Sequence, residues 1–325
     1  MRLTGLTVRA LEGILESRTR AIAAAKWIYG ARTEPLETLG APIASRLRAY
    51  AETEIRIADR TTAADGTIKL AMALAGGVVE TVMIPTARRS TICVSSQVGC
   101  TRNCAFCATA KLGFARNLTA DEIVAQFLIA RALAPVPATN VVFMGMGEPM
   151  DNLDAVLTAV EILTQTPAPQ LGHAQVTVST SGVLPGMKRF LAATKCSLAL
   201  SLNGSSDEQR VKTMPQTKSW PIALLLALLR DYPDRVHFIE YVMFDGINDA
   251  DADAHRVVDL LSGVNARLNL IPHNAIAGSA LCASPRERIE AFQRIAVARG
   301  LRTMIRWPRG NDIAAACGQL AARAT

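Results

Sequence analysis

The feature that most restricts the possible fold is a regular alternation of strands and helices beyond Ser90. Short apolar and β-branched runs recur at intervals of very roughly 20 to 40 residues with helical segments between them, as in the βαβ units of a parallel sheet. The expected strands are residues 90–95, 140–145, 175–180, 196–202, 235–244, 266–271 and 301–306. The pattern predicts an α/β fold with a barrel or partial barrel over residues 86–310. Such a barrel binds its ligands in the loops that follow the strands.

Residues 1–85 have a different pattern and are expected to form a helical and small β appendage. Apolar residues recur at helical spacing over 11–30 and again over 36–52, which predicts two helices. Short strands are then expected at 55–59, 67–74 and 78–85, with turn signals at Asp65-Gly66 and Gly76-Gly77 between them. At the other end of the chain, residues 311–325 have weak periodicity and are expected to form a C-terminal loop over the barrel mouth.

Several helix ends carry capping signals. The expected starts are capping boxes at Thr119 with Glu122 and at Ser284 with Glu287, the second with Pro285 at the first helical position. Gly300 is expected to cap a C-terminus.

The composition fits a protein that folds around a large apolar core. Half of the 325 residues are hydrophobic, and the longest apolar runs, such as 221–229, fall short of the roughly 20 residues needed to cross a bilayer. The N-terminus lacks the apolar region and cleavage site of a signal peptide, so a cytoplasmic location is expected. The net charge of +7 fits a polyanionic partner, and it also fits many proteins without one.

Four of the seven cysteines lie in the stretch CVSSQVGCTRNCAFC, from Cys93 to Cys107. Seven is an odd number of cysteines, and four of them are spaced too closely for the disulfide framework of a secreted protein. Reduced thiols with chemical roles are therefore expected. Cys100, Cys104 and Cys107 form a C-x3-C-x2-C motif after the first barrel strand. A closed structural zinc site needs four ligands, and none of the four histidines has a suitable spacing. Three thiolates on one short loop fit an iron–sulfur cluster with one iron left open.

A C-x3-C-x2-C motif after the first strand of a parallel barrel resembles the signature of the radical S-adenosylmethionine superfamily. The resemblance implies a partial (β/α)6 barrel and a [4Fe–4S] cluster held by Cys100, Cys104 and Cys107. It also implies that the open iron binds the amino and carboxylate groups of S-adenosylmethionine, which an injected electron cleaves to a 5'-deoxyadenosyl radical. A structural zinc site stays as the alternative.

Polar residues at the ends of later strands fit the same ligand. The motif GMGEP follows the second strand, where glycines admit close backbone approach and the glutamate has the charge to bind an ammonium group. Hydroxyls and amides in STSG, SLN and LIPHN suit ribose and adenine. The expected cofactor-binding residues are Gly147, Glu148, Ser179, Ser201, Leu202, Asn203 and Asn274. Each motif alone also fits a tight turn or a helix cap.

Further segments narrow the resemblance to one family. CVSSQVGC, VVFMGMGEPMDNL, VTVSTSG, NLIP and RGNDIAAACGQL together resemble the RlmN/Cfr family of radical S-adenosylmethionine RNA methyltransferases, from about residue 20 to the C-terminus. The resemblance implies methylation of an adenine ring carbon, carbon 2 in 23S ribosomal RNA, with tRNA as a further substrate. The same chemistry on carbon 8 or on another RNA is one alternative. A non-catalytic, zinc-containing RNA-binding protein is the other.

The resemblance also implies roles for three residues outside the cluster motif. Cys317 is methylated by one S-adenosylmethionine, and a second gives the radical that takes hydrogen from that methyl, so two are used per turnover. Cys93 then attacks the Cys317 sulfur and leaves a disulfide, and Glu80 matches the base that deprotonates the adduct. From the residues alone, Glu80 also fits an ordinary strand position, and Cys317 fits a small buried hydrophobe. Cys196 and Cys282 are likewise expected to be small buried hydrophobes.

The implied partners are RNA and an electron donor such as flavodoxin or ferredoxin. Five basic residues are expected near the barrel mouth, where they favour phosphate contacts: Arg102, Lys111, Arg116, Arg306 and Arg309. Residues 1–85 are expected to serve either as an RNA-recognition surface or as packing support. No obvious interface stripe is present, so a monomer without membrane contact is expected.

Overall fold

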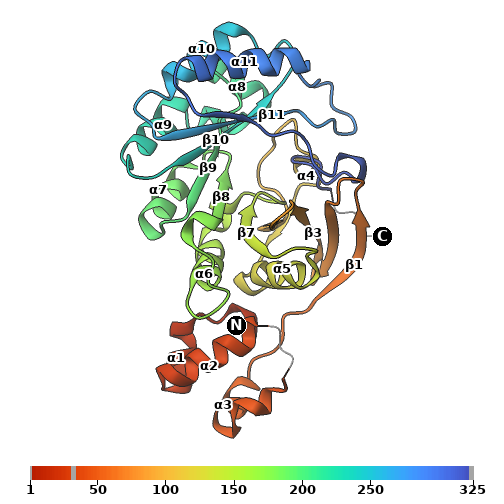
Figure 1. Ribbon diagram of the computed structural model, residues 1–325, viewed down its shortest axis with the longest axis vertical. Coiled ribbons are helices and arrows are strands. Elements are labelled where there is room, and N and C mark those ends of the chain that lie inside the picture. Colours follow the sequence, from red (N-terminus) through yellow and green to blue (C-terminus); the bar gives the residue numbers. More distant parts are fainter. Residues whose placement is uncertain (1, 31–33, 322–325) are drawn as a thin grey trace.

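An open parallel barrel forms the body of the protein (Figure 1). The structure, a computed structural model, describes residues 2–30 and 34–321. All seven expected barrel strands are present in this part of the chain, and each pairs in parallel with the next. They are β4 (Ser90–Cys93), β7 (Ala138–Phe143), β8 (Val176–Thr180), β9 (Ser197–Ser201), β10 (His237–Met243), β11 (Ala266–Pro272) and β12 (Thr303–Ile305). The predicted α/β partial barrel is confirmed.

Helices cover the outer face of this sheet (Figure 1). They are α5 (Ala120–Leu133), α6 (Leu153–Thr164), α7 (Leu184–Ala193), α8 (Asp207–Thr213), α9 (Ile222–Arg230), α10 (Asp251–Leu260) and α11 (Arg286–Ala298). Burial alternates along several strands, as in β8, where Val176, Val178 and Thr180 are buried and the residues between them are half-buried. Within residues 2–30 and 34–321, no helix is long and apolar enough to span a membrane.

Two of the three predicted helix caps are confirmed. Thr119 and Glu122 form the capping box that starts α5, and Gly300 follows α11 with φ +85°, where its N–H bonds to the Val297 carbonyl at 2.9 Å. The prediction of a capping box at Ser284 is wrong. Pro285 takes the N-cap position of α11 itself, so Ser284 lies one residue too far out, and its hydroxyl is buried without a partner.

The antiparallel element of the appendage continues the barrel sheet. Strands β1 (Ile55–Thr62), β2 (Ile68–Leu74) and β3 (Gly77–Pro85) pair antiparallel, and β3 pairs antiparallel with β4. Within the described residues the result is one ten-stranded sheet from β1 to β12. The boundary predicted after residue 85 therefore falls between two hydrogen-bonded strands, and β2 and β3 form one wall of the barrel mouth.

The N-terminal helices group at one end of the molecule (Figure 1). The helix predicted over 11–30 is two helices, α1 (Val8–Leu15) and α2 (Arg18–Tyr29), because Glu16 adopts a left-handed conformation and Ser17 caps α2. The helix predicted over 36–52 is also shorter than expected. A 3-10 turn leads to α3 (Ala41–Leu47), which begins only after Gly40, at φ +86°. Pro42 belongs in a first helical turn and explains this late start.

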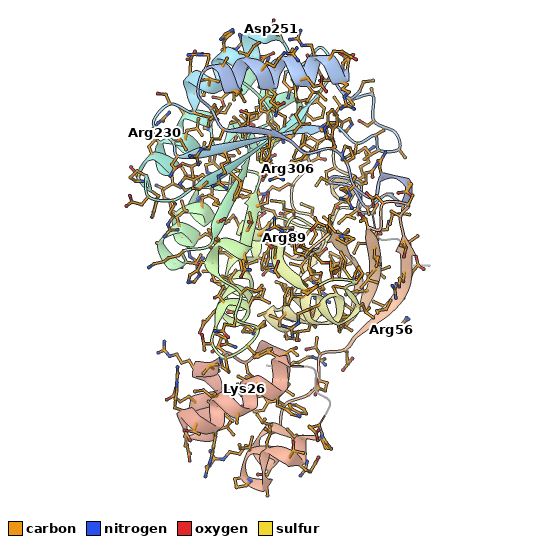
Figure 2. The ribbon with its side chains drawn as sticks, viewed as in Figure 1. Lys26, Arg56, Arg89, Arg230, Asp251 and Arg306 are labelled. Carbon is orange, nitrogen blue, oxygen red and sulfur yellow. The ribbon has the colours of Figure 1, made fainter. Side chains whose placement is uncertain are left out.

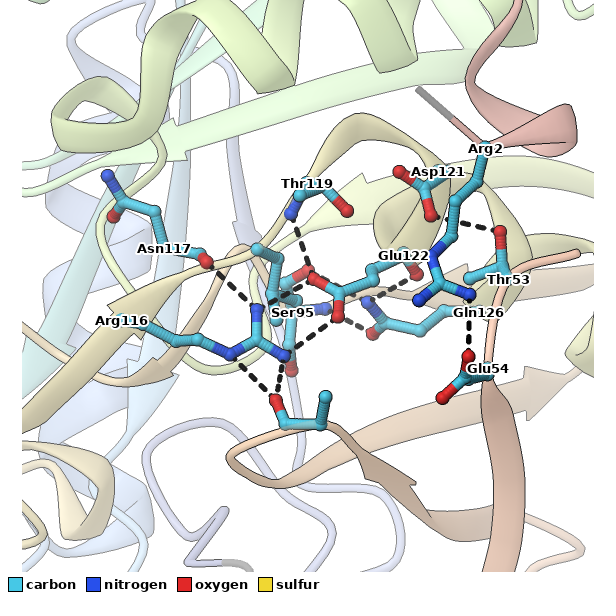
Figure 3. Close-up of polar contacts among 12 residues, drawn as sticks. Arg2, Thr53, Glu54, Ser95, Arg116, Asn117, Thr119, Asp121, Glu122 and Gln126 are labelled. Carbon is cyan, nitrogen blue, oxygen red and sulfur yellow. Dashed lines mark hydrogen bonds and ion pairs between the residues drawn. The ribbon is translucent and has the colours of Figure 1, made fainter. Parts of the chain in front are cut away.

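A short hairpin beside the barrel was not predicted. Strand β5 (Gln97–Gly99) pairs with β6 (Phe114–Asn117), and the loop between them carries the cysteine motif and the short helix α4 (Ala108–Lys111). A polar network anchors the hairpin (Figure 3). Arg116 Nη2 donates to Glu122 Oε1 at 2.7 Å, and Gln126 Oε1 accepts from the Ser95 N–H at 2.9 Å. The loop is thereby tied to α5 and to the segment after β4.

Candidate active site

The cysteine loop is held at its base by backbone contacts. The Cys100 N–H donates to the Gly113 carbonyl at 2.9 Å, which closes the loop against β6. A side chain at Gly99, which has φ +76°, would place its Cβ only 1.9 Å from that carbonyl oxygen. At the far side, the Ala105 N–H donates to the Thr213 carbonyl at 2.9 Å. These contacts fix the shape of the loop and join it to the last residue of α8.

The three motif thiols are close enough to influence one another. Burial raises the pKa of Cys100 and of Cys104 to about 12, and the charge of Cys107 adds to both increases. Metal binding would therefore have to displace protons from these thiols. Among the residues described, no three His, Cys, Asp or Glu side chains converge closely enough to hold a single ion. Three cysteines on one loop match the thiolate ligands of a [4Fe–4S] cluster with one open iron, whereas a closed structural zinc site needs four ligands.

Glu148 lies buried beside the cysteine loop. Its Oε2 accepts from the Ser181 N–H at 2.8 Å and from Ser181 Oγ at 2.7 Å, and Oε1 accepts from the Met150 N–H at 3.0 Å. Burial raises the pKa of Glu148 because it disfavours the charged carboxylate, and a cationic group bound beside it would offset that effect. A Cβ at Gly147 would lie 2.7 Å from the Gln97 nitrogen, which shows how closely the two backbones approach. The serine that contacts Glu148 is Ser181, two residues after the predicted cofactor-binding Ser179.

The residues expected at the end of β9 use their polar groups within the protein. Asn203 is buried at φ +52°, and its Oδ1 accepts from the Val242 N–H at 2.8 Å, which links the ends of β9 and β10. The Leu202 N–H donates to the Glu240 carbonyl at 2.9 Å. The carbonyls of Ser201 and Leu202 both accept from the buried Arg210 side chain. These hydrogen bonds hold the backbone at the end of β9 in place.

The C-terminal loop lies against the cysteine loop. The Gly318 carbonyl accepts from the Ala108 N–H at 2.7 Å, and the Leu320 carbonyl accepts from Thr109 Oγ1 at 2.6 Å. Asn274, expected to contact the cofactor, donates from Nδ2 to the Cys317 carbonyl at 2.9 Å. These contacts fix Cys317 next to the cysteine motif.

Glu80 also contacts this loop. Its Oε2 accepts from the Ala321 N–H at 2.8 Å, and its Oε1 pairs with Lys69 Nζ at 3.0 Å. Lys69 Nζ donates in addition to the Ala314 carbonyl at 3.2 Å. The Lys69–Glu80 pair thus contacts both ends of the segment that has Cys317 at its middle.

Two further cysteines, Cys93 and Cys317, are close enough for the charge of Cys317 to act on Cys93. Cys93 is buried on β4, and burial raises its pKa to about 12, with an added contribution from the charge of Cys317. Cys317 is exposed. The pKa of its thiol is nevertheless raised to about 11, chiefly because the surrounding protein excludes water and secondly because of the negative charge of Glu240. Cys196 is buried as expected. Cys282 is exposed, so the expectation of a buried side chain is wrong there.

Glu240 and Arg210 are buried charged residues that were not predicted from the sequence. Glu240 on β10 accepts from Asn269 Nδ2 at 2.8 Å, and Asn269 Oδ1 accepts from Arg306 Nε at 3.0 Å; Figure 2 labels Arg306. Arg210 on α8 is fully buried under the ends of β8 and β9. Neither residue stands in a recognisable motif, although an ionisable residue within an apolar strand, as at Glu240, is a usable signal.

The expected basic residues around the mouth are largely engaged. Arg102 pairs with Asp151. Arg116 pairs with Glu122, as Figure 3 shows. Lys111 Nζ donates to the Ala277 carbonyl at 2.6 Å. These side chains therefore hold the loops of the mouth together as well as adding positive charge to it.

The fold and the site together define a radical S-adenosylmethionine enzyme. Residues 94–257 match the family model described as the Radical SAM superfamily. Membership of this superfamily implies a [4Fe–4S] cluster and S-adenosylmethionine as cofactors. The cysteine loop after the first parallel strand and the buried Glu148 beside it are compatible with both groups.

Comparison with individual proteins identifies the family. Over 99% of its length the chain is 41% identical to "Dual-specificity RNA methyltransferase RlmN 2" of Myxococcus xanthus, of which 90% is covered. It is 42% identical over 91% of its length to "Dual-specificity RNA methyltransferase RlmN" of Dinoroseobacter shibae, of which 80% is covered. The crystal structure of a radical SAM methyltransferase from Sphaerobacter thermophilus matches with a TM-score of 0.91 and 37% identity, over 99% of this chain and 100% of that one. The chain belongs to the RlmN/Cfr family and is a radical S-adenosylmethionine methyltransferase.

Proposed function

We propose that the protein methylates carbon 2 of an adenine in 23S ribosomal RNA, and also in tRNA. The observation that carries this proposal is the position of Cys317, whose loop contacts the cysteine motif through Ala108 and Glu80 through Ala321. A methyl-carrying thiol, a base and a second thiol are the groups that this reaction needs. The relatives named as dual-specificity RNA methyltransferases support RNA as the substrate.

The chemistry of the target explains why a protein thiol takes part. Carbon 2 of adenine is an electron-poor sp² centre, so it cannot attack a methylsulfonium as a nucleophile. A carbon radical can add to it. Two molecules of S-adenosylmethionine per turnover, with a cluster on Cys100, Cys104 and Cys107, would supply the methyl group and the radical when bound. Gly147, Glu148, Ser179, Ser201, Leu202, Asn203 and Asn274 are the residues proposed to hold S-adenosylmethionine.

The chain's own residues would carry out the remaining steps. Cys317 accepts the methyl group and, after loss of a hydrogen atom, joins it to the ring carbon. The resulting adduct has one unpaired electron. Glu80 takes the proton that this ring carbon loses, and the adduct also gives up one electron, which an oxidised cluster on Cys100, Cys104 and Cys107 would accept when bound, so that a closed-shell thioether remains. The Cys93 thiolate then attacks the Cys317 sulfur, the bond from that sulfur to the transferred carbon breaks, and the carbon takes up a proton to become the methyl group. A disulfide between Cys93 and Cys317 remains and is reduced by two electrons before the next turnover.

The proposal also covers how the protein meets RNA, its electron donor, the roles of its segments and its location. The target adenine has to leave its stack to reach the barrel mouth, as for other enzymes that modify bases. Flavodoxin or ferredoxin would deliver the electron for the radical step. Residues 1–85 are the proposed RNA-recognition region, residues 86–310 the catalytic barrel and residues 311–325 the loop that carries the methyl acceptor. We propose a cytoplasmic, monomeric enzyme.

The test is the position of the methyl group in RNA. RNA incubated anaerobically with the cluster-loaded protein, a reductant and S-adenosylmethionine is digested to nucleosides and compared with synthetic 2-methyladenosine and 8-methyladenosine. The proposal predicts 2-methyladenosine, which Cys317→Ala should fail to produce. Product methylated only at carbon 8 would contradict the assignment of carbon 2. Purified protein containing zinc and no iron or sulfide would contradict the proposed function as a whole.

A further inference from the structure

Arg210, in α8, is a fully buried arginine with 0% exposure. Its guanidinium binds three carbonyls at the ends of β8 and β9. Nε donates to the Leu202 carbonyl at 2.9 Å, and Nη2 donates to the carbonyls of Ser181 at 2.5 Å and Ser201 at 3.2 Å. Nη1 donates to Thr217 Oγ1 at 2.7 Å. One side chain thus ties together the strand ends that carry the proposed cofactor residues.

All of these acceptors are neutral. In the part of the chain that the structure describes, no carboxylate forms an ion pair or hydrogen bond with the Arg210 guanidinium. A buried charge without a partner costs several kcal/mol, so proteins normally pair it. Burial lowers the pKa of Arg210 to about 10, and the negative charges of Cys104 and then Asp207 act in the opposite direction. The buried cation therefore lacks a contacting anion.

The surroundings leave room for this guanidinium. Gly182 has φ +100°, and a Cβ there would lie 3.0 Å from Arg210 Nη2. A Cβ at Gly204 would lie 2.9 Å from the Arg210 backbone nitrogen. Gly182 thus lets the end of β8 approach the guanidinium, and Gly204 lets the segment after β9 approach the backbone and Cβ of Arg210. The arginine occupies a position shaped for it.

The cysteine loop lies directly on the element that carries Arg210. The Thr213 carbonyl, at the end of α8, accepts from the Ala105 N–H at 2.9 Å. Gln216 Nε2 contacts Cys104 Sγ at 3.6 Å. A cluster bound there carries net negative charge, because its three thiolates outweigh the charge of the oxidised core.

We propose that Arg210 is a positioning residue whose positive charge is balanced by the cluster on Cys104, and that the cluster is easier to reduce because of it. The inference rests on the proposed ligation of a [4Fe–4S] cluster by the cysteine loop. One electron added to the cluster increases its negative charge by one, and a buried cation nearby stabilises that reduced form. The hydrogen bonds of Arg210 also hold the backbone of Ser181, Ser201 and Leu202 in place.

The reduction potential of the cluster tests the charge. It is measured by anaerobic redox titration, followed by electron paramagnetic resonance, on the reconstituted protein and three variants. Arg210→Met should shift the potential to a lower value, whereas Arg210→Lys, which keeps the charge, should stay close to the unsubstituted protein. Arg230→Met is the matched control, because exposed Arg230 also binds only carbonyls, those of Leu260 and Ser262. A cluster in Arg210→Met with an unchanged potential would overturn the proposal.

Thermal stability separates this role from ordinary packing. The fall in melting temperature caused by Arg210→Met should be larger in cluster-loaded than in cluster-free protein, because only the loaded form contains the balancing anion. Equal losses in both forms would contradict the charge pairing. Arg210→Gln, which keeps part of the hydrogen bonding without the charge, replaces Arg210→Met if the latter does not fold. Protein that binds no cluster at all would refute the proposed function, whereas a bound cluster indifferent to residue 210 would refute only this inference.

Discussion

The carboxyl of Glu240 provides a quantitative prediction about pH and stability. Burial raises its pKa from 4.5 to about 7, against the opposing effects of the Asn269 hydrogen bond and the Arg306 charge. In the folded protein the group keeps its proton up to about pH 7, whereas in the unfolded chain it ionises near pH 4.5. Between these values the folded state binds more protons than the unfolded state, so the stability of the protein falls as the pH rises. Above about pH 7 the loss is complete and constant.

Glu240→Gln removes this loss. The amide keeps an oxygen that can accept from Asn269 Nδ2, and it carries no charge to bury. A rise in pKa from 4.5 to about 7 corresponds to about 3 kcal/mol of destabilisation at high pH. The variant should therefore be more stable than the unsubstituted protein by up to that amount at about pH 8.5, and the advantage should shrink to less than about 1 kcal/mol near pH 5.

The assay is thermal unfolding of the cluster-loaded protein, followed anaerobically by circular dichroism at about pH 5 and about pH 8.5. For a chain of this size the predicted difference corresponds to an increase in melting temperature on the order of 5 °C at the higher pH. Glu161→Gln, on the exposed face of α6, is the control and should change little at either pH. A Glu240→Gln difference that is the same at both pH values, or of opposite sign, would refute the argument.

Two further predictions concern Cys317 and its loop. Cys93→Ala should trap protein covalently linked to RNA, while Cys317→Ala should neither methylate nor trap; a free and fully active Cys93→Ala enzyme would show that the resolving role is wrong. Lys69→Met should speed amide hydrogen exchange in residues 314–321 by at least ~10-fold, because it removes one tie at Ala314 and disturbs Glu80, which binds Ala321. Exposed Lys188→Met is the control, and unchanged exchange in Lys69→Met would contradict the clamping role.

The sequence was most informative where local pattern and burial agree. Each barrel strand is an apolar run bounded by turn residues, and all seven were located because such runs have no competing helical periodicity. The cysteine motif was found for a similar reason, since its spacing on one loop is a local property. The break at Glu16 was missed because no glycine or proline marks it.

The missing parts depend on contacts between distant segments. Arg210 lies in the polar stretch SSDEQRVK, which predicts an exposed helix, and only the meeting of the β8 and β9 ends above it buries the side chain. The hydrogen bond from Asn274 to the Cys317 carbonyl joins residues 43 positions apart and was not predicted. The pairing of β3 with β4 joined the appendage to the barrel, and hydrophobic pattern alone carries no information on strand partners.

The central claim is that Cys317 carries the methyl group, and peptide mass spectrometry tests it most directly. The cluster-loaded protein is incubated anaerobically with methyl-deuterated S-adenosylmethionine and a reductant, and the peptide containing Cys317 is then analysed. A labelled methyl group on Cys317 is the predicted result. An unmodified Cys317, in protein whose cluster is shown to be intact, would contradict the account.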